Sequence, residues 1–330
     1  MRKVTLFHER AYVKTWRCKT RPMARVIVVG AGVVGLSCAV RLLEQGHEVS
    51  VVARDLPMET TSAVAAALWY PYRAYPFERV TGWATTTYTE LASLAASDET
   101  GVRMVAGTEV FRRSPAPLPW WASAVPEVGP APELPVGYAA GVTFRAPVVE
   151  MPVYLAWLVD RVDSLGGTVT RMALGGLPDL AQVVVNASGL GARLLAQDGA
   201  LLPVRGQVVR VEQVGLDRWW LDGDGPTYVV PRSDDIVLGG TDEEGSWDPA
   251  PDETIAKEIL GRARELVPEL RRATVLGHRV GLRPARPTVR LEATTSPTGG
   301  RVVHCYGHGG AGVTVSWGCA AEVADLVGAG

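Results

Sequence analysis

The sequence predicts an α/β protein in which a parallel-sheet domain is assembled from discontinuous segments and carries an inserted α+β domain of mixed sheet. Three observations favour this fold class. A β-branched apolar run at residues 25–29 leads through glycines and a helical pattern to a second apolar run at 48–53, as in a βαβ unit. A second strand, glycine and helix pattern lies near the C-terminus, at residues 301–318. Strand-rich sequence separates the two, so we expect both ends of the chain in one domain.

The size and composition of the chain fit a globular protein of two domains. It has 330 residues, of which 47% are hydrophobic and 21% are charged. The formal net charge is −2 and the basic residues are scattered, so we expect no binding to nucleic acid. No apolar run reaches the roughly 18 residues that a membrane-spanning helix needs, so we expect no membrane association. We expect residues 1–23 to form a disordered tail.

The four cysteines show neither a disulfide framework nor a metal site. Cys38 and Cys305 fall in helix and strand patterns, no pair has C-x-x-C spacing, and no histidine stands at ligand spacing. We therefore expect small buried thiols, no metal and a reducing, cytoplasmic location.

The first unit of the chain predicts binding of a dinucleotide. After the strand at 25–29, Gly30 permits a tight turn, Gly32 lets the backbone approach a pyrophosphate, and Gly35 lets the following helix pack closely on the strand. Amide groups at the helix start then face negative charge. We expect the helix at residues 36–45, although a tight turn without a ligand stays an alternative. The expected cofactor contacts in this Rossmann-like unit are Gly30, Ala31, Gly32, Val33, Val34 and Gly35.

The end of the second strand concerns the identity of the dinucleotide. Such a strand usually ends in an acid that accepts a hydrogen bond from the adenosine ribose. Here either Asp55 takes that role one residue late, or Arg54 contacts ribose or phosphate, which also raises NADP as a cofactor. Residues 60–69 argue against NADP, because their small side chains suit a bulky planar ligand and their hydroxyls can reach phosphate oxygens. Read alone, this segment would also fit an alanine-rich helix. The expected contacts here are Arg54, Asp55, Thr60, Thr61, Ala67 and Leu68.

The middle of the chain alternates between helix and strand patterns, interrupted by a proline-dense surface excursion at residues 114–137. Helices are predicted at 85–97, 154–165 and 253–266, and strands at 183–185, 204–211, 227–230, 235–238 and 301–305. We also expect cofactor contacts at Leu174, Ser188 and Gly189. The predicted cofactor-binding domain comprises residues 24–73, 151–200 and 284–330, and the predicted substrate-binding domain comprises 74–150 and 201–283.

Four segments together resemble the D-amino-acid oxidase family, which includes D-aspartate oxidase. They are the turn at Gly30, the Thr-Thr-x-x-Val-Ala-Ala-x-Leu-Trp segment at 60–69, Gly-Leu-Arg-Pro-Ala-Arg-Pro at 281–287, and Gly-His-Gly-Gly at 307–310 with Trp317-Gly318. The resemblance runs from about Ala24 to the C-terminus. It implies noncovalently bound FAD and oxidation of a D-amino acid by hydride transfer to flavin N5. The imino acid then hydrolyses to a 2-oxo acid and ammonia, and O2 is reduced to H2O2.

The resemblance also implies roles for individual residues. Arg283 matches the arginine that pairs with the substrate carboxylate, Tyr228 a tyrosine that hydrogen-bonds the same group, and Gly310 the position whose carbonyl receives the amine. A guanidinium holds a carboxylate through two parallel hydrogen bonds, so the substrate Cα hydrogen can be aimed at the flavin without a protein base at that carbon. The expected cofactor contacts at this end are Arg283, His308, Gly309, Gly310, Gly312, Val313 and Thr314.

Each of these residues has a structural alternative. Arg283 and Arg286 could brace a loop through ion pairs, a role that we favour for Arg286 alone. Tyr228 could be a core tyrosine. His308 is a candidate base, but its glycine neighbours favour either a role in bracing the loop or a contact with the flavin.

The chain departs from the family at the active-site lid. Members with a mobile lid carry a second tyrosine four residues before the position of Tyr228, where this chain has Asp224. A family tyrosine after the Gly-Gly pair is replaced by Ala311. We therefore expect no tyrosine lid and a more open entrance.

The substrate side chain is the least determined feature. Trp69, Tyr70 and Tyr72 are expected near the flavin ring and favour neutral side chains. D-aspartate would need a second cation, for which Arg112, Arg113 and Arg232 are candidates, because a lone buried charge is costly. A glycine or sarcosine oxidase would share the fold, whereas an NADP-dependent reductase or a non-catalytic flavin-binding protein represent other classes. The expected partners are a D-amino acid and O2, and we also consider a homodimer.

Overall fold

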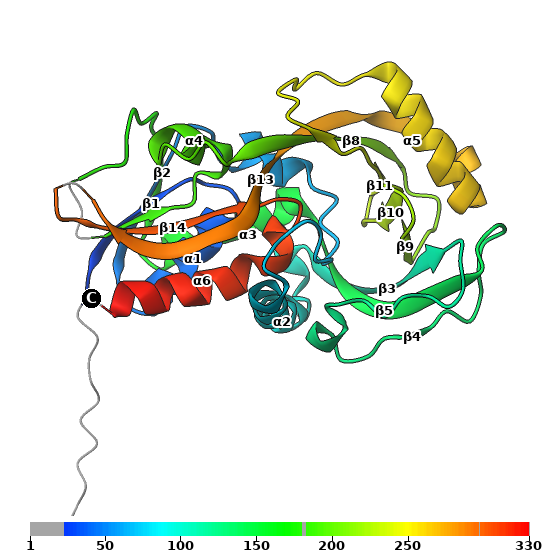
Figure 1. The fold of residues 1–330 in the computed structure, drawn as a ribbon, viewed down its shortest axis with the longest axis horizontal. Helices are drawn as coiled ribbons and strands as arrows, with labels where there is room; N and C mark the ends of the chain where they lie inside the picture. The colour runs from blue at the N-terminus through cyan, green and yellow to red at the C-terminus, as the bar shows by residue number, and fades with distance from the viewer. Residues whose placement is uncertain (1–22, 180–182, 297, 330) are drawn as a thin grey trace, which may run out of the picture.

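We describe the fold from a computed structural model that covers residues 23–179, 183–296 and 298–329. Except for Met23, the expected N-terminal tail lies outside the described residues. The strands form one continuous sheet whose order is β4-β5-β3-β9-β10-β11-β8-β13-β14-β7-β1-β2-β6, and β12 pairs with β8 off this path. The helices pack on its faces (Figure 1). No helix in the described part of the chain is long and apolar enough to cross a membrane.

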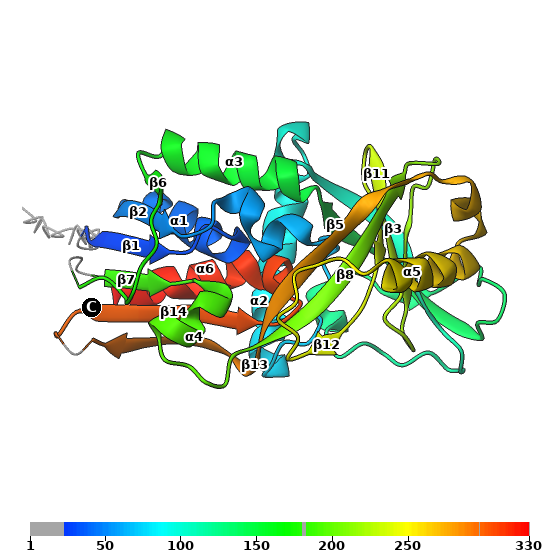
Figure 2. The same ribbon diagram turned by 90° about the horizontal axis from the view of Figure 1, so that it is seen from above.

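One half of the sheet is parallel and β-branched on both faces, as expected for strands covered on two sides. Helices α1, α3 and α6 cover one face, and the short α4 lies across the other (Figures 1 and 2). The strands are β1 (Arg25–Val29), β2 (Glu48–Ala53), β6 (Thr168–Arg171), β7 (Val183–Asn186) and β14 (Arg301–His308), and the helices are α1 (Val33–Glu44), α3 (Met151–Ser164), α4 (Ala192–Leu195) and α6 (Gly312–Gly328).

The other half of the sheet is mainly antiparallel and continues from the first through one long strand. This strand, β13 (Val275–Thr295), pairs with β8 over residues 275–285 and with β14 over 285–295. The expected domain boundary at 283/284 therefore falls inside a strand that belongs to both halves. The remaining strands are β3 (Val102–Phe111), β4 (Gly129–Pro130), β5 (Ala140–Val149), β8 (Leu202–Glu212), β9 (Trp219–Asp222), β10 (Tyr228–Pro231), β11 (Asp235–Gly239) and β12 (Glu243–Glu244).

The two faces of the antiparallel half have different coverings. Side chains such as Val229 and Leu238 pack against the amphipathic helix α5 (Glu253–Leu266), whose first turn is capped by the carboxylate of Asp252. Because side chains alternate along a strand, their neighbours Tyr228 and Gly239 face the opposite side. That side forms one wall of the cavity described below.

Several predicted elements differ from the observed ones. Helix α1 begins at Val33 rather than residue 36, because the turn is complete at Gly32. Helix α2 (Phe77–Leu94) replaces the helix expected at 85–97. It begins directly after Pro76, because a proline disfavours helical backbone at the residue that precedes it. Strand β13 was not predicted because its prolines argue against a strand interior; they are accommodated where the strand changes partners. The proline-dense excursion contains only a short 3-10 helix and the two-residue strand β4.

Candidate active site

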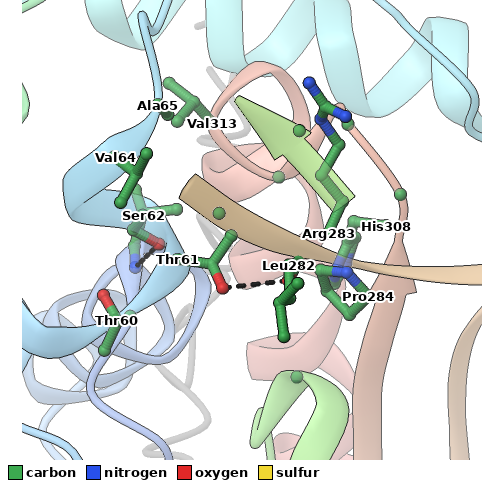
Figure 3. Close-up of a pocket in the computed structure, with 18 of the residues that line it drawn as sticks. Thr60, Thr61, Ser62, Val64, Ala65, Leu282, Arg283, Pro284, His308 and Val313 are labelled. Atoms are coloured by element: carbon green, nitrogen blue, oxygen red, sulfur yellow. Dashed lines mark hydrogen bonds between the residues drawn. The ribbon is translucent and has the colours of Figure 1, made fainter. Parts of the chain in front are cut away.

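A cavity of about 1290 Å³ runs from the glycine turn before α1 to the antiparallel half of the sheet. Its volume exceeds the roughly 300–1,000 Å³ of common small-molecule sites, which suits a dinucleotide together with a substrate. Segments far apart in the sequence line it, among them residues 60–62, 64–68, 187–191, 225–228 and 280–284. Figure 3 shows part of this lining, with Thr60, Leu282 and His308 among the labelled residues.

The glycine turn closes one part of the cavity and depends on two close approaches. Gly30 has a φ of +116°, and a Cβ there would lie 2.4 Å from the carbonyl oxygen of Ala187. Only glycine tolerates both the backbone angle and this contact. The next residues begin α1, whose first amide, from Val33, donates to the hydroxyl of Ser62 at 3.0 Å. The N-terminus of α1, which is the positive end of the helix dipole, therefore faces the cavity.

The hydroxyl groups of the 60–64 segment brace this wall. The Thr60 hydroxyl donates to the carbonyl of Pro57 at 2.7 Å, and that of Thr61 donates to the carbonyl of Leu282 at 2.9 Å (Figure 3). These hydroxyl protons are thus engaged within the protein, and the segment is tied to β13. Backbone amides at the turn are the better candidates for contacting a phosphate.

Both residues proposed to contact the adenosine part of the dinucleotide, Arg54 and Asp55, lie at the end of β2. Arg54 and Asp55 line the cavity and bind each other, with Arg54 Nη2 2.6 Å from a carboxylate oxygen of Asp55. The Arg54 side chain is 75% exposed, so this pair is solvated and weak. Both groups are therefore available at the same end, and the choice between them stays open.

A second helix N-terminus reaches the cavity at α6. Gly312, Val313 and Thr314 line the cavity there, after the turn that contains Gly309 and Gly310. The Thr314 hydroxyl accepts from the amide of Tyr70 at 3.1 Å and donates to its carbonyl at 3.0 Å. This double contact fixes the Tyr70 segment against α6.

Arg283 lies at the centre of the antiparallel end of the cavity. One guanidinium nitrogen donates to the carbonyl of Thr241 at 2.9 Å and lies 3.9 Å from a carboxylate oxygen of Asp242. The guanidinium rests over Gly206, where a Cβ would lie 2.3 Å from its Nη2 atom. The arginine is thus positioned through Nη1 by a neutral carbonyl and carries only a distant ion pair. Such a cation suits an incoming carboxylate.

Tyr228 stands beside this arginine on the same face of the sheet. Its ring covers the backbone of β11, since a Cβ on Gly239 would lie 1.9 Å from the ring. Burial raises the pKa of the Tyr228 hydroxyl, and the Arg283 cation opposes this shift without cancelling it. The hydroxyl therefore stays protonated at neutral pH and can donate a hydrogen bond into the cavity.

Gly310 and Tyr72 form the part of the rim opposite the sheet. A Cβ on Gly310 would lie 2.5 Å from a ring carbon of Tyr72, whose hydroxyl donates to Asp242 at 3.0 Å. None of the described backbone or side-chain groups donates to the Gly310 carbonyl outside the regular elements. Trp247, which is 52% exposed, lines the cavity as well.

Where family members with a mobile lid carry the second tyrosine, this chain has a short turn between β9 and β10. Asp224 lies in this turn, and its carboxylate accepts from the amide of Arg112 at 2.6 Å rather than covering the cavity. Ala311 is fully buried. These contacts are consistent with the absence of a tyrosine lid, which stays a prediction.

His308 lines the cavity at the end of β14 and is almost fully buried. Burial lowers its pKa to about 4, so the imidazole is neutral at pH 7. Its Nε2 lies 3.9 Å from the sulfur of Cys305, and the possible ligand atoms of Cys305, His308 and Cys319 lie within 4.8 Å of one another. Because the pKa values of both thiols are raised, neutral thiols are favoured, and these are poor metal ligands.

The structure brings nearly all predicted site residues to one cavity, with two corrections. Gly35 does not line it but lies inside α1, where a Cβ would be 2.0 Å from the Gly30 carbonyl oxygen. This glycine therefore fits the expected role in helix packing but is not placed for the expected cofactor contact. Trp69 is fully buried, and its indole donates to the Ala84 carbonyl at 3.1 Å. It faces α2 because its neighbours Leu68 and Tyr70 take the cavity side of an extended segment.

The three arginines considered as partners for the side-chain carboxylate of an acidic substrate lie outside the cavity lining. Arg112 contacts Asp222 at 3.1 Å, and Arg232 contacts Asp235 at 2.6 Å. Arg113 is exposed, and none of the three lines the cavity. Arg286 binds Asp198 at 2.9 Å, which agrees with its expected bracing role.

Some cavity residues were not predicted from the sequence. Ser62 stands between two predicted contacts and could have been found from its hydroxyl. Glu109 and Leu221 lie on strands that were not predicted, and Thr241 contributes through its backbone carbonyl, for which no side-chain signal exists.

Comparison with known proteins agrees with this geometry. Residues 25–326 match the DAO family, described as FAD dependent oxidoreductase. The chain is 53% identical over 317 residues to a D-amino-acid oxidase of Rubrobacter xylanophilus, which covers 94% of this chain and 97% of that protein. It is 39% identical over 326 residues to a D-aspartate oxidase of Homo sapiens, which covers 92% of this chain and 94% of that protein.

Among solved structures, glycine oxidase from Geobacillus kaustophilus has a similar fold, with a TM-score of 0.77 over 92% of this chain and 94% of that one. Its sequence identity of 20% supports the fold alone. The family match and the identity to the curated relatives carry the stronger conclusion. The chain belongs to the D-amino-acid oxidase family of FAD-dependent oxidoreductases.

Proposed function

We propose that this protein oxidises D-amino acids in the cavity between the two halves of its sheet. The observation that carries the proposal is the common cavity, which has a dinucleotide turn at one end and the Arg283–Tyr228 pair at the other. The D-amino acid would lose two electrons and two protons to give an imino acid, which water hydrolyses to a 2-oxo acid and ammonia. The two electrons would reduce O2 to H2O2.

The residues of the cavity fit FAD. Its elongated volume, the close backbone approaches at Gly30 and Gly32, and two helix N-termini match a ligand that has a pyrophosphate and a large flat ring. The small residues at 65–67 leave room for such a ring. FAD, when bound, supplies the acceptor for the hydride and the site at which O2 is reduced.

Arg283 and Tyr228 would hold the substrate carboxylate. The Arg283 guanidinium donates to the Thr241 carbonyl through Nη1 and interacts with the Tyr228 hydroxyl, and the two-donor fork of a guanidinium matches a carboxylate. Tyr228, whose ring lies against Gly239, would donate a hydrogen bond from its neutral hydroxyl to the same carboxylate. The fixed positions of both groups orient the substrate before it reacts.

The substrate amine would be received on the other side, by the carbonyl of Gly310. The carbonyl oxygen would accept a hydrogen bond from the nitrogen and so orient the amine, and Tyr72 packs against Gly310 and keeps this segment in place. His308, neutral and bordered by the thiol of Cys305, would contact the cofactor rather than remove a proton. No protein base at the reacting carbon is then required.

The absence of a second cation at the substrate end favours non-acidic side chains. The arginines that line the described part of the cavity are Arg54, Arg193 and Arg283, and only Arg283 lies beside Tyr228. An acidic substrate would place its second carboxylate in a buried region without a partner. D-aspartate oxidation stays the alternative, because a relative carries that name. A cytoplasmic location, a homodimer and the proposed domain boundaries stay predictions.

The experiment that tests the proposal is a peroxide assay with a panel of D- and L-amino acids that includes glycine and D-aspartate. We expect FAD absorbance in the purified protein and peroxide with neutral D-amino acids but not with their L-forms. Bound FAD without turnover of any panel member would instead indicate a flavin-binding protein. Preferred turnover of D-aspartate would overturn the proposed substrate class.

A further inference from the structure

We propose that Glu109 is a specificity-determining residue whose carboxylate accepts a hydrogen bond from a cationic substrate side chain, such as that of D-lysine. This inference rests on the proposed function and extends the substrate class from neutral to basic side chains. The carboxyl group of Glu109 lines the cavity, although no local sequence pattern indicates an acid there.

The register of the sheet places Glu109 on the same wall as Tyr228. Glu109 in β3 is paired with Leu221 in β9, and Leu221 is paired with Tyr228 in β10. Residues paired in this way point to the same face, and all three line the cavity. The neighbouring Val110 points to the other face, where it packs beneath α5.

The distance across this wall suits a long substrate side chain. Two strand spacings separate Glu109 from Tyr228, which is about 9–10 Å between their backbones. Tyr228 marks the position of the substrate carboxylate in the proposed function. A side chain that extends from there over Leu221 would approach Glu109 with its far end.

Glu109 is buried without a cationic partner. It is 5% exposed, and one carboxylate oxygen, Oε1, accepts from the hydroxyl of Tyr70 at 2.7 Å. No hydrogen bond to the other oxygen, Oε2, and no ion pair to Glu109 is found within residues 23–179, 183–296 and 298–329. Glu109 lines the cavity and Oε2 is not among the buried unpartnered atoms, so a cationic donor of a ligand could reach this oxygen from the cavity.

Asp222 gives a comparison within the same cavity. Its Oδ2 atom already receives donors from Arg112 at 3.1 Å and from the Tyr138 hydroxyl at 2.9 Å, and Oδ1 accepts the amide of Asp224. The charge of Asp222 is therefore compensated by the protein itself. Glu109 lacks this compensation, so a ligand can supply the missing positive charge and hydrogen-bond donor.

The protonation of Glu109 agrees with this role. Burial raises its pKa to about 7, and the hydrogen bond from Tyr70 opposes the shift. The carboxyl group is thus close to half ionised near neutral pH. A neutral side chain can be tolerated by the protonated form, whereas a cation would favour the ionised form.

The test compares Glu109→Gln with the natural enzyme on D-lysine and on D-norleucine, which has the same carbon chain but no terminal amine. Because a charge-assisted hydrogen bond is lost, we expect kcat/KM for D-lysine to fall about tenfold or more, mainly through KM. For D-norleucine we expect a change of less than about threefold. Glu265→Gln on the exposed surface of α5 is the matched control and should change neither value.

A parallel change for both substrates, or no change for either, would overturn the role of Glu109. The same conclusion would follow if the natural enzyme oxidised D-norleucine but not D-lysine. Retained FAD absorbance and D-norleucine turnover show that the variant is folded. If neither substrate is oxidised by the natural enzyme while FAD is bound, the proposed function itself fails, which is a distinguishable result. Glu109→Asp, which keeps the charge, should restore part of the preference for D-lysine.

Discussion

The two ends of the cavity are built by different means. The cofactor end consists mostly of backbone, with a glycine turn, two helix N-termini and hydroxyls that are engaged in bracing. The substrate end consists of side chains that stand on the antiparallel wall, and two of them, Arg283 and Tyr228, each lie over a glycine. The cofactor end therefore tolerates changes of side chain as long as the turn is kept. At the substrate end a single side chain can decide which molecule is bound.

The largest effect should follow from Arg283→Leu at the substrate end. The substrate carboxylate would lose its cation and be left buried, so we expect kcat/KM for D-methionine to fall about 100-fold or more. FAD binding should be retained, because the change lies at the other end from the glycine turn. Steady-state peroxide kinetics and flavin absorbance measure the two effects separately.

Arg286→Leu is the matched control on the same strand. Arg286 is tied to Asp198 and does not line the cavity, so KM should stay within about twofold while the melting temperature falls. Equal losses of activity in both variants would show that the Arg-Pro segment acts as a structural unit, and the proposed contrast between the two ends would be lost.

Gly206→Ala tests the floor beneath the arginine. The new Cβ would lie 2.3 Å from the Arg283 guanidinium. The guanidinium is the flexible end of a long side chain, so it can move aside more easily than the backbone can. We therefore expect KM to rise about tenfold or more with little change in the free energy of unfolding, as measured by denaturant titration. Gly261→Ala in α5, where nothing lies within 4 Å, should instead leave KM unchanged and stabilise the protein by about 1 kcal/mol. An unchanged KM in Gly206→Ala would mean that the observed position of Arg283 is not the one that binds substrate.

The same contrast explains what the sequence could predict. The turn at Gly30 is local, since its glycines, strand and helix follow one another, and spacing was enough to predict which residues line the cavity there, apart from Gly35. Glu109 depends on the pairing of β3 with β9, which joins residues more than 100 positions apart, and no local pattern indicates that register. Trp69 was assigned to the wrong face because a short extended segment lacks the length to show which alternate residues face inward.

The pH dependence of selectivity follows from the raised pKa of Glu109. As pH rises from 6 to 8 through a pKa of about 7, the ionised fraction of Glu109 increases about tenfold. The ratio of kcat/KM for D-lysine to that for D-norleucine should rise by up to this factor, whereas effects on the shared α-amino group cancel. The rise should vanish in Glu109→Gln.

Other ionisable groups near Glu109 should not produce this trend. Tyr70 and Tyr228 have raised pKa values and stay protonated over this range. The guanidinium group of Arg283 is a permanent cation. A ratio that is flat with pH in the natural enzyme would indicate that the Glu109 carboxyl group keeps one protonation state at the substrate end.

The smallest effect should appear at the cofactor end, with Ser62→Ala. This change removes the hydroxyl that receives the first amide of α1, and a single neutral hydrogen bond contributes about 1 kcal/mol. The dissociation constant of FAD, measured by flavin fluorescence after removal and re-addition of the cofactor, should rise about fivefold. KM for D-methionine should be unchanged at saturating FAD, because the Ser62 hydroxyl contacts the first amide of α1 and not Arg283. A change in KM with unchanged FAD affinity would show that the 60–64 segment, which is tied to β13 through Thr61, transmits changes from one end of the cavity to the other.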